Sequence, residues 1–156
     1  MTAREAEIIE LIRKEVKPAL GCTEPIAVAL AVAKAMEIIE DNCALAPHWR
    51  MQDGFTLRIE VSGNILKNGM GVGIPGTGMV GLHIAAALGA VCGRSEYGLE
   101  VLNDLDEASI ERAKQLVLDK SVTVGLAETD HKLYVKAIIE CKDGHTAYTV
   151  IEDNHD

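Results

Sequence analysis

Aromatic side chains are scarce in this sequence, because Trp, Tyr and Phe together make up 3% of its 156 residues. A hydrophobic core must therefore be built from Ile, Leu, Val and Ala. The chain is long enough for one domain with its own core, and its 48% hydrophobic and 25% charged residues are typical of globular proteins. We expect residues 1–156 to form a single domain.

The sequence also lacks a cluster of basic residues, and its net charge is −9. Proteins that bind nucleic acid neutralise phosphates with Lys and Arg gathered on one face. Attachment to an anionic membrane surface needs a similar polybasic segment. We therefore expect neither nucleic acid nor a membrane among the partners.

Residues 1–10 carry acidic side chains where a secretory leader would need an apolar stretch. A stretch without Asp, Glu, Lys or Arg, residues 68–93, includes eight glycines and Pro75. Only residues 79–92 of it are expected to continue as a helix, which is too short to cross a bilayer core of about 30 Å. The expected location is the cytoplasm.

The four cysteines, at positions 22, 43, 92 and 141, form no C-x-x-C pair. This spacing argues against a self-contained zinc or thioredoxin-type site, and reduced thiols are the default in the cytoplasm. The sequence also lacks the G-x-x-x-x-G-K-[ST], G-x-S-x-G and H-E-x-x-H motifs.

Hydrophobic periodicity predicts the helices and strands. Helices are expected at residues 3–16, 26–39, 79–91 and 106–118. The second has Thr23 as a suitable N-cap and Pro25 in its first turn, and Asp106 or Asp104 is suited to cap the last.

Strands are expected at residues 55–61, 121–127, 132–141 and 145–152. Short turns at residues 129–130 and 143–144 join the last three, which indicates hairpins. The predicted class is α+β, with helices packed on one face of a mostly antiparallel sheet of about four strands.

Residues 61–81 form a glycine-rich segment that holds seven of the fourteen glycines. Dense glycine is expected where the backbone turns sharply or approaches a ligand closely. The N–H groups of such a loop can cradle an anion, and Lys67 adds a positive charge beside it. We therefore predict a loop that faces a ligand rather than a Gly-Ser linker.

Two overlapping G-x-G-x-x-G patterns begin at Gly71 and Gly76. A dinucleotide site needs a strand directly before the first glycine in a parallel βαβ unit, and that context is missing here. The second pattern does lead into a predicted helix, so a site for a small anion such as a carboxylate is retained.

Cys22 is the foremost candidate for chemistry, since it directly precedes a predicted helix N-terminus, where a thiolate is favoured. The alternative is a buried, inert thiol. Asn64, Lys67 and Asn68 are candidates to orient a substrate carboxylate or amino group, and a polar turn after a strand explains them equally well. No histidine is assigned a role.

Four motifs together carry a resemblance to a known family: V-K-P-A-L-G-C-T-E-P (16–25), S-G-N-I-L-K-N-G-M-G-V (62–72), P-G-T-G-M-V-G (75–81) and G-L-E-V-L (98–102). They resemble the N-terminal part of the L-cysteine desulfidase family, within the iron–sulfur serine dehydratase alpha-chain group. The resemblance covers essentially the whole chain, and it implies that the chain is the N-terminal fragment of a longer enzyme.

The resemblance implies that the full-length enzyme removes sulfide from L-cysteine and gives ammonia and pyruvate. A [4Fe–4S] cluster would act as Lewis acid, with its ligands mostly outside this chain. Cys22 matches the cysteine of the G-C-T-E-P motif and is implied to be a catalytic base or a cluster ligand. No other residue of this chain is expected to bind metal.

From the chemistry of these motifs we infer a substrate-binding set made of Thr23, Glu24, Asn64, Lys67, Asn68, Gly76, Thr77 and Gly78. The expected partners are a small amino acid and the rest of the same polypeptide, and a homo-oligomer is left open. Alternatives are an L-serine dehydratase-type deamination and a non-catalytic small-molecule-binding or regulatory module. The 156-residue chain alone is expected to be inactive.

Overall fold

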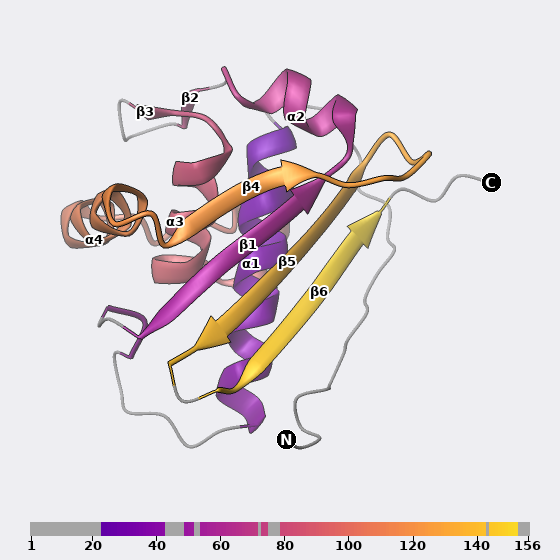
Figure 1. Cartoon of the computed structure of the whole chain (residues 1–156). Helices are drawn as coiled ribbons and strands as arrows, with labels where there is room; N and C mark the ends of the chain where they lie inside the picture. Colours follow the sequence, from indigo (N-terminus) through magenta and orange to yellow (C-terminus); the bar gives the residue numbers. More distant parts are fainter. Residues whose placement is uncertain are drawn as a thin grey trace.

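Four strands make up the central sheet of the structure, a computed structural model that describes residues 23–42, 49–51, 54–71, 73–74, 79–142 and 144–152. They are β1 (Phe55–Val61), β4 (Val122–Leu126), β5 (Tyr134–Cys141) and β6 (Thr146–Glu152), in the spatial order β4-β1-β5-β6 (Figure 1). β5 pairs antiparallel with both β1 and β6, while β1 and β4 run parallel. The predicted α+β class with a mostly antiparallel sheet is confirmed.

The helices α1 (Thr23–Asn42) and α3 (Leu82–Cys92) pack on one face of this sheet, and α4 (Glu107–Leu118) packs beside α3. Burial along β1 alternates, so that every second side chain points into the core: Phe55, Leu57, Ile59 and Val61. This alternation is what a strand with one covered face requires.

The core is largely aliphatic, as the scarcity of aromatic residues predicts. Small side chains let the backbones of α1 and α3 touch, because an ideal Cβ at Gly89 would lie 2.5 Å from the carbonyl oxygen of Ala29. On the other side of α1, the fully buried hydroxyl of Thr149 in β6 donates a 2.7 Å hydrogen bond to the carbonyl oxygen of Ala31. These contacts fix α1 against α3 on one side and against the sheet on another.

The connection between β4 and β5 is not the hairpin that the sequence predicts. β1 lies between the two strands, and β4 joins the sheet parallel to it. Backbone hydrogen bonds from Ala127 to Val61 and from Ser62 to Tyr134 show that the connecting chain passes the end of β1. Parallel pairing follows from the long crossover through α3 and α4 between β1 and β4. The predicted β5–β6 hairpin is confirmed, with Gly144 at φ +98°.

The first part of the glycine-rich segment is a helix, α2 (Gly63–Gly69), and the prediction of a loop there is wrong. The buried hydroxyl of Ser62 caps it, accepting a hydrogen bond from the Ile65 backbone N–H at 3.3 Å and donating one to the Lys132 carbonyl at 2.7 Å. This cap and the burial of Ile65 outweigh the low helix propensity of the glycines.

Two short strands, β2 (Gly73–Ile74) and β3 (Met79–Val80), follow and pair with each other. α3 therefore begins at Leu82 instead of residue 79. The predicted helix at residues 26–39 is confirmed and extends to Asn42. Asp106 caps α4 as predicted, accepting a hydrogen bond from the Ser109 N–H at 2.8 Å.

Two short 3-10 helices, η2 (Trp49–Met51) and η3 (Ser95–Glu100), complete the described elements. The predicted helix at residues 3–16 lies outside the described residues.

Candidate functional site

Three helix ends meet at one end of the sheet: the start of α1, the end of α2 and the start of α3. Their meeting point is the buried Gly69, where an ideal Cβ would lie 2.6 Å from Leu82 Cδ2 and 3.3 Å from Glu24 Cβ. In Figure 1 the dark indigo start of α1 lies directly beneath α2. The backbone at the end of α2 is thus in contact with the first turns of both α1 and α3.

A second contact closes the glycine-rich segment on itself. An ideal Cβ at Gly81 would lie 3.2 Å from the carbonyl oxygen of Met70, so residues from either side of the β2–β3 pair come together. Gly81 has φ +106°, a conformation that side chains rarely adopt, and it is the N-cap of α3 without any side-chain cap. Gly81 thus offers no side-chain oxygen to the first N–H groups of α3, and N–H groups at a helix start are suited to an anion.

The polar side chains of α2 lie on its exposed side. The amide of Asn68 donates a 3.3 Å hydrogen bond to the amide oxygen of Asn64, one turn earlier. Lys67, which precedes Asn68 in the sequence, is also exposed. Glu24 is half-buried in the first turn of α1. The positively charged Lys67 therefore belongs to α2, whose end contacts the N-terminal turns of α1 and α3. Each of these two N-termini carries a partial positive charge.

The structure brings only part of the predicted substrate-binding set together. Glu24 lies against the end of α2, the helix that carries Asn64, Lys67 and Asn68. Thr23 begins α1, but its side chain lies outside the described part. Cys22, Gly76, Thr77 and Gly78 also lie outside the described residues. Sequence reasoning missed Gly69 and Leu82 as contact points, since nothing in the sequence indicates which glycines touch another segment.

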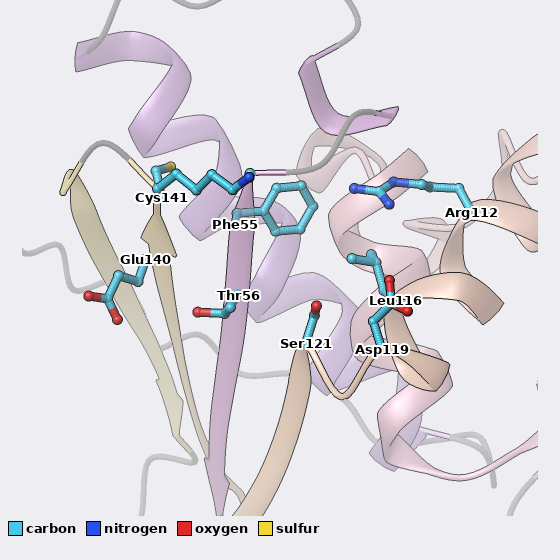
Figure 2. Close-up of a pocket in the computed structure, with 10 residues that line it drawn as sticks. Phe55, Thr56, Arg112, Leu116, Asp119, Ser121, Glu140 and Cys141 are labelled. Carbon is cyan, nitrogen blue, oxygen red and sulfur yellow. The ribbon is translucent and has the colours of Figure 1, made fainter.

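A cavity of about 440 Å³ lies at the opposite end of the sheet, where β1 begins. In Figure 2 the side chain of Arg112 reaches from α4 toward the Phe55 ring, with Asp119 and Ser121 below. The Arg112 guanidinium carbon lies 5.7 Å from the centre of that ring, a cation–π contact. None of the motif residues lines this cavity, so no pattern in the sequence pointed to it.

A second cavity, of about 450 Å³, is lined by a network of ion pairs at the other end of α1. Arg50 donates to both Glu40 carboxylate oxygens, at 2.8 and 3.0 Å, and to the Gly93 carbonyl oxygen at 3.0 Å. Trp49 Nε1 donates to Glu40 as well, at 2.7 Å. The polar groups of this network bind one another and tie the end of α1 to the end of α3.

The pKa of the Glu40 carboxyl group is lowered by this network. Burial alone would raise it, but the hydrogen bonds from Arg50 and Trp49 and the nearby Arg charges outweigh burial. The ionised carboxylate is therefore the form that the fold stabilises.

The two cysteines in the described part, Cys92 and Cys141, lie away from the meeting point of the helix ends. Cys141 is buried at the end of β5, and Cys92 is half-buried at the end of α3. Burial raises the pKa of the Cys92 thiol, and a hydrogen bond with Ser109 opposes this only in part. A thiol that resists ionisation is a poor nucleophile or base.

A [4Fe–4S] cluster is held by several Cys thiolates. Within the part of the chain that the structure describes, no group of three or more His, Cys, Asp or Glu side chains is placed to hold a metal ion. The described residues therefore do not fit such a cluster.

Among the described helices, none is both long and apolar enough to span a membrane.

Three curated relatives illustrate what the chain is similar to. It is 49% identical over 150 residues to a protein of Phocaeicola vulgatus. The aligned region covers 96% of this chain and 32% of the relative. A protein of Parabacteroides distasonis is 50% identical over 137 residues, which are 88% of this chain and 29% of that relative. A protein of Shewanella pealeana is 47% identical over 148 residues, covering 94% and 32%.

Each of these relatives is described as a UPF0597 protein, a description that names no reaction and no ligand. The chain spans about a third of the length of the curated relatives it matches. No protein-family model matches the chain. No solved structure matches it either. The comparisons thus find the chain similar to UPF0597 proteins over nearly its whole length.

Proposed function

We propose that the chain is the N-terminal, substrate-side part of a carbon–sulfur lyase that eliminates sulfide from L-cysteine and gives pyruvate and ammonia. One observation carries the proposal beyond the motif resemblance. Gly69 of the second motif lies against Glu24 of the first, and Met70 of the second approaches Gly81 of the third. Parts of three motifs therefore meet at one place, the first of them far in sequence from the other two, as the parts of a binding site do.

The chemistry of this meeting point suits an α-amino acid. The charge of Lys67, the amides of Asn64 and Asn68, and the N–H groups at the start of α3 are suited to hold the substrate carboxylate. Residues 76–78 belong to the same glycine-rich segment and are assigned to the same task. The ligand-binding role of the exposed α2 face rests on the positive charge of Lys67 and on the hydrogen-bonding amides of Asn64 and Asn68.

Elimination also needs a base for the α-proton of the substrate. Cys22 directly precedes the first residue of α1, where the helix N-terminus favours a thiolate. As this base takes the proton, the electron pair of the C–H bond forms the Cα=Cβ bond, and the C–S bond breaks to release sulfide. The enamine left behind is hydrolysed by water to pyruvate and ammonia.

The length of the relatives supports a larger enzyme around this part. Because the chain matches only about a third of each relative, the remaining two-thirds would supply further residues of the site. By the resemblance, a [4Fe–4S] cluster supplies Lewis-acid chemistry when bound. The described residues do not provide its ligands.

The test is an anaerobic assay of the full-length enzyme with L-cysteine and, separately, with L-serine. The proposal predicts sulfide and pyruvate in equal amounts from L-cysteine, at a higher kcat/KM than ammonia release from L-serine. A preference for L-serine would instead identify a dehydratase. Binding of an amino acid without turnover would contradict a lyase and favour a regulatory module.

Variants of Cys22 test the role of the thiol. Cys22→Ala should lower kcat by about 100-fold or more, the usual contribution of a general base, and Cys22→Ser should retain little activity. Cys141→Ala is the control, because Cys141 is buried at the opposite end of the sheet, and its effect should be mild. Equal losses in the Ala variants would point to misfolding and would contradict the role given to Cys22.

A further inference from the structure

We propose that Gly69 is a positioning residue of this site: the absence of a side chain there sets how closely the buried face of α2 packs on the first turns of α1 and α3, and so where the polar side chains of α2 lie. The functional readout rests on the lyase function proposed above.

Gly69 is required for space and not for backbone conformation. Its φ lies outside the left-handed region, in contrast to Gly81 at +106°. A Cβ at residue 69 would lie 2.6 Å from Leu82 Cδ2, a separation that requires something to move, and 3.2 Å from Leu82 Cγ, which is a tight contact. Glu24 Cβ, 3.3 Å away, is a further close neighbour.

Leu82 has little room to yield. Its side chain is fully buried at the start of α3, and protein interiors hold few voids into which its methyl group could shift. The α2 side of the contact is freer to move, since its polar side chains are exposed. An added Cβ at Gly69 is therefore expected to push the end of α2 outward.

The start of α2 is held in place, so that this push tilts the helix. Ser62 binds the Lys132 carbonyl through its hydroxyl at 2.7 Å and the Tyr134 carbonyl through its N–H at 3.0 Å. A tilt about Ser62 displaces Lys67 and Asn68, near the far end, more than Asn64. Those two side chains are assigned to the substrate carboxylate, whereas the base Cys22 belongs to another segment.

The experiment compares Gly69→Ala with Gly63→Ala in the full-length enzyme. Gly63 lies on the same helix, and its Cβ would meet only Leu126 Cδ1, at 3.8 Å. Because misplacement of positioning groups by about 1 Å lowers rates by up to about 100-fold, Gly69→Ala should raise KM for L-cysteine roughly tenfold or more, with a smaller change in kcat. Gly63→Ala should leave both constants within about twofold of wild type, since it meets no close neighbour.

Rescue separates positioning from a general loss of stability. Leu82→Ala removes the atoms that an alanine at position 69 would strike. The double variant should therefore have a lower KM than Gly69→Ala alone, although Leu82→Ala by itself destabilises the core. A merely structural role would lower the active fraction, and so the apparent kcat, without changing KM and without rescue.

The outcomes distinguish this inference from the proposed function. A wild-type enzyme that releases no sulfide overturns the lyase proposal, and calorimetric binding of L-cysteine then replaces KM as the readout for Gly69. Weaker binding in Gly69→Ala, restored by Leu82→Ala, supports the positioning role. A KM or affinity no different from that of Gly63→Ala overturns it, and absence of any binding overturns both proposals.

Discussion

At the scale of single residues, the Glu40 carboxylate shows how one side chain joins distant parts of the chain. It accepts hydrogen bonds from Trp49 and Arg50, and Arg50 in turn binds the Gly93 carbonyl. These bonds lower the pKa of the Glu40 carboxyl group in spite of partial burial, which acts in the opposite direction. The charge on Glu40 therefore contributes to the stability of the fold.

The pH dependence of stability should show this contribution. Because the pKa is lower in the folded state, the unfolded chain takes up the proton first as the pH falls. The contribution is present above the ordinary value of 4.5 and is lost as the pH falls through the folded value. Glu40→Gln should cost at most about 1 kcal/mol at pH 7, since the pair is partly exposed, and progressively less as the pH falls below 4.5.

Urea unfolding at pH 7, 5 and 3 measures this difference, with Glu140→Gln as the control for an exposed carboxylate on the uncovered face of the sheet. If Glu40→Gln destabilised the protein equally at pH 7 and pH 3, the ionised carboxylate would have no special role.

Two glycines illustrate how far the sequence predicts a site at this scale. Gly69 and Gly81 both belong to the glycine-rich segment that we expected to face a ligand. The structure explains the need for glycine differently at the two positions: Gly69 is in close contact with Leu82, and Gly81 adopts φ +106°. Neither the packing against Leu82 nor the backbone conformation of Gly81 can be read from the local pattern, so the sequence indicates that the glycines matter but not why.

At the scale of elements, the contact between α1 and α3 depends on a glycine whose neighbour is backbone. An ideal Cβ at Gly89 would lie 2.5 Å from the carbonyl oxygen of Ala29 and 2.9 Å from its Cα. Backbone atoms cannot rotate away as the end of a side chain can. The two helices would therefore have to separate to admit any side chain at this position.

Gly89→Ala should accordingly destabilise the protein by about 3 kcal/mol, the upper part of the range for overpacked cores, in spite of the better helix propensity of Ala. Gly125→Ala is the matched control, because no atom lies within 4 Å of an ideal Cβ there. Chemical unfolding followed by circular dichroism measures both. A loss in Gly89→Ala no greater than in Gly125→Ala would contradict the close approach of the helices.

The elements differ in how well the sequence predicts them. The alternation of Phe55, Leu57, Ile59 and Val61 is a local signal, and it predicts the bounds of β1. The helix α2 was missed because seven residues with glycine at both ends have little intrinsic helix propensity. Its stability comes from the local Ser62 cap and from two tertiary effects, the hydrogen bond from Ser62 to the Lys132 carbonyl and the burial of Ile65.

At the scale of the whole molecule, the topology decides which motifs meet. β1 ends beside α2, and α1 and α3 begin at the same end of the sheet (Figure 1). The parallel pairing of β1 with β4 was not predicted, because it depends on where the crossover through α3 and α4 returns the chain. The same long-range packing brings Glu24, Gly69 and Gly81 to one region, which no local pattern in the sequence indicates.

The most direct test of the proposed function is amide hydrogen exchange of the full-length Cys22→Ala protein, with and without saturating L-cysteine, since under that proposal this variant should bind L-cysteine without consuming it. We expect slower exchange at the start of α1, along residues 63–71 and at the start of α3, and no change around the Phe55 cavity. Protection confined to that cavity, or exchange that L-cysteine leaves unchanged everywhere in this chain, would contradict a substrate site at the meeting point of the three helix ends.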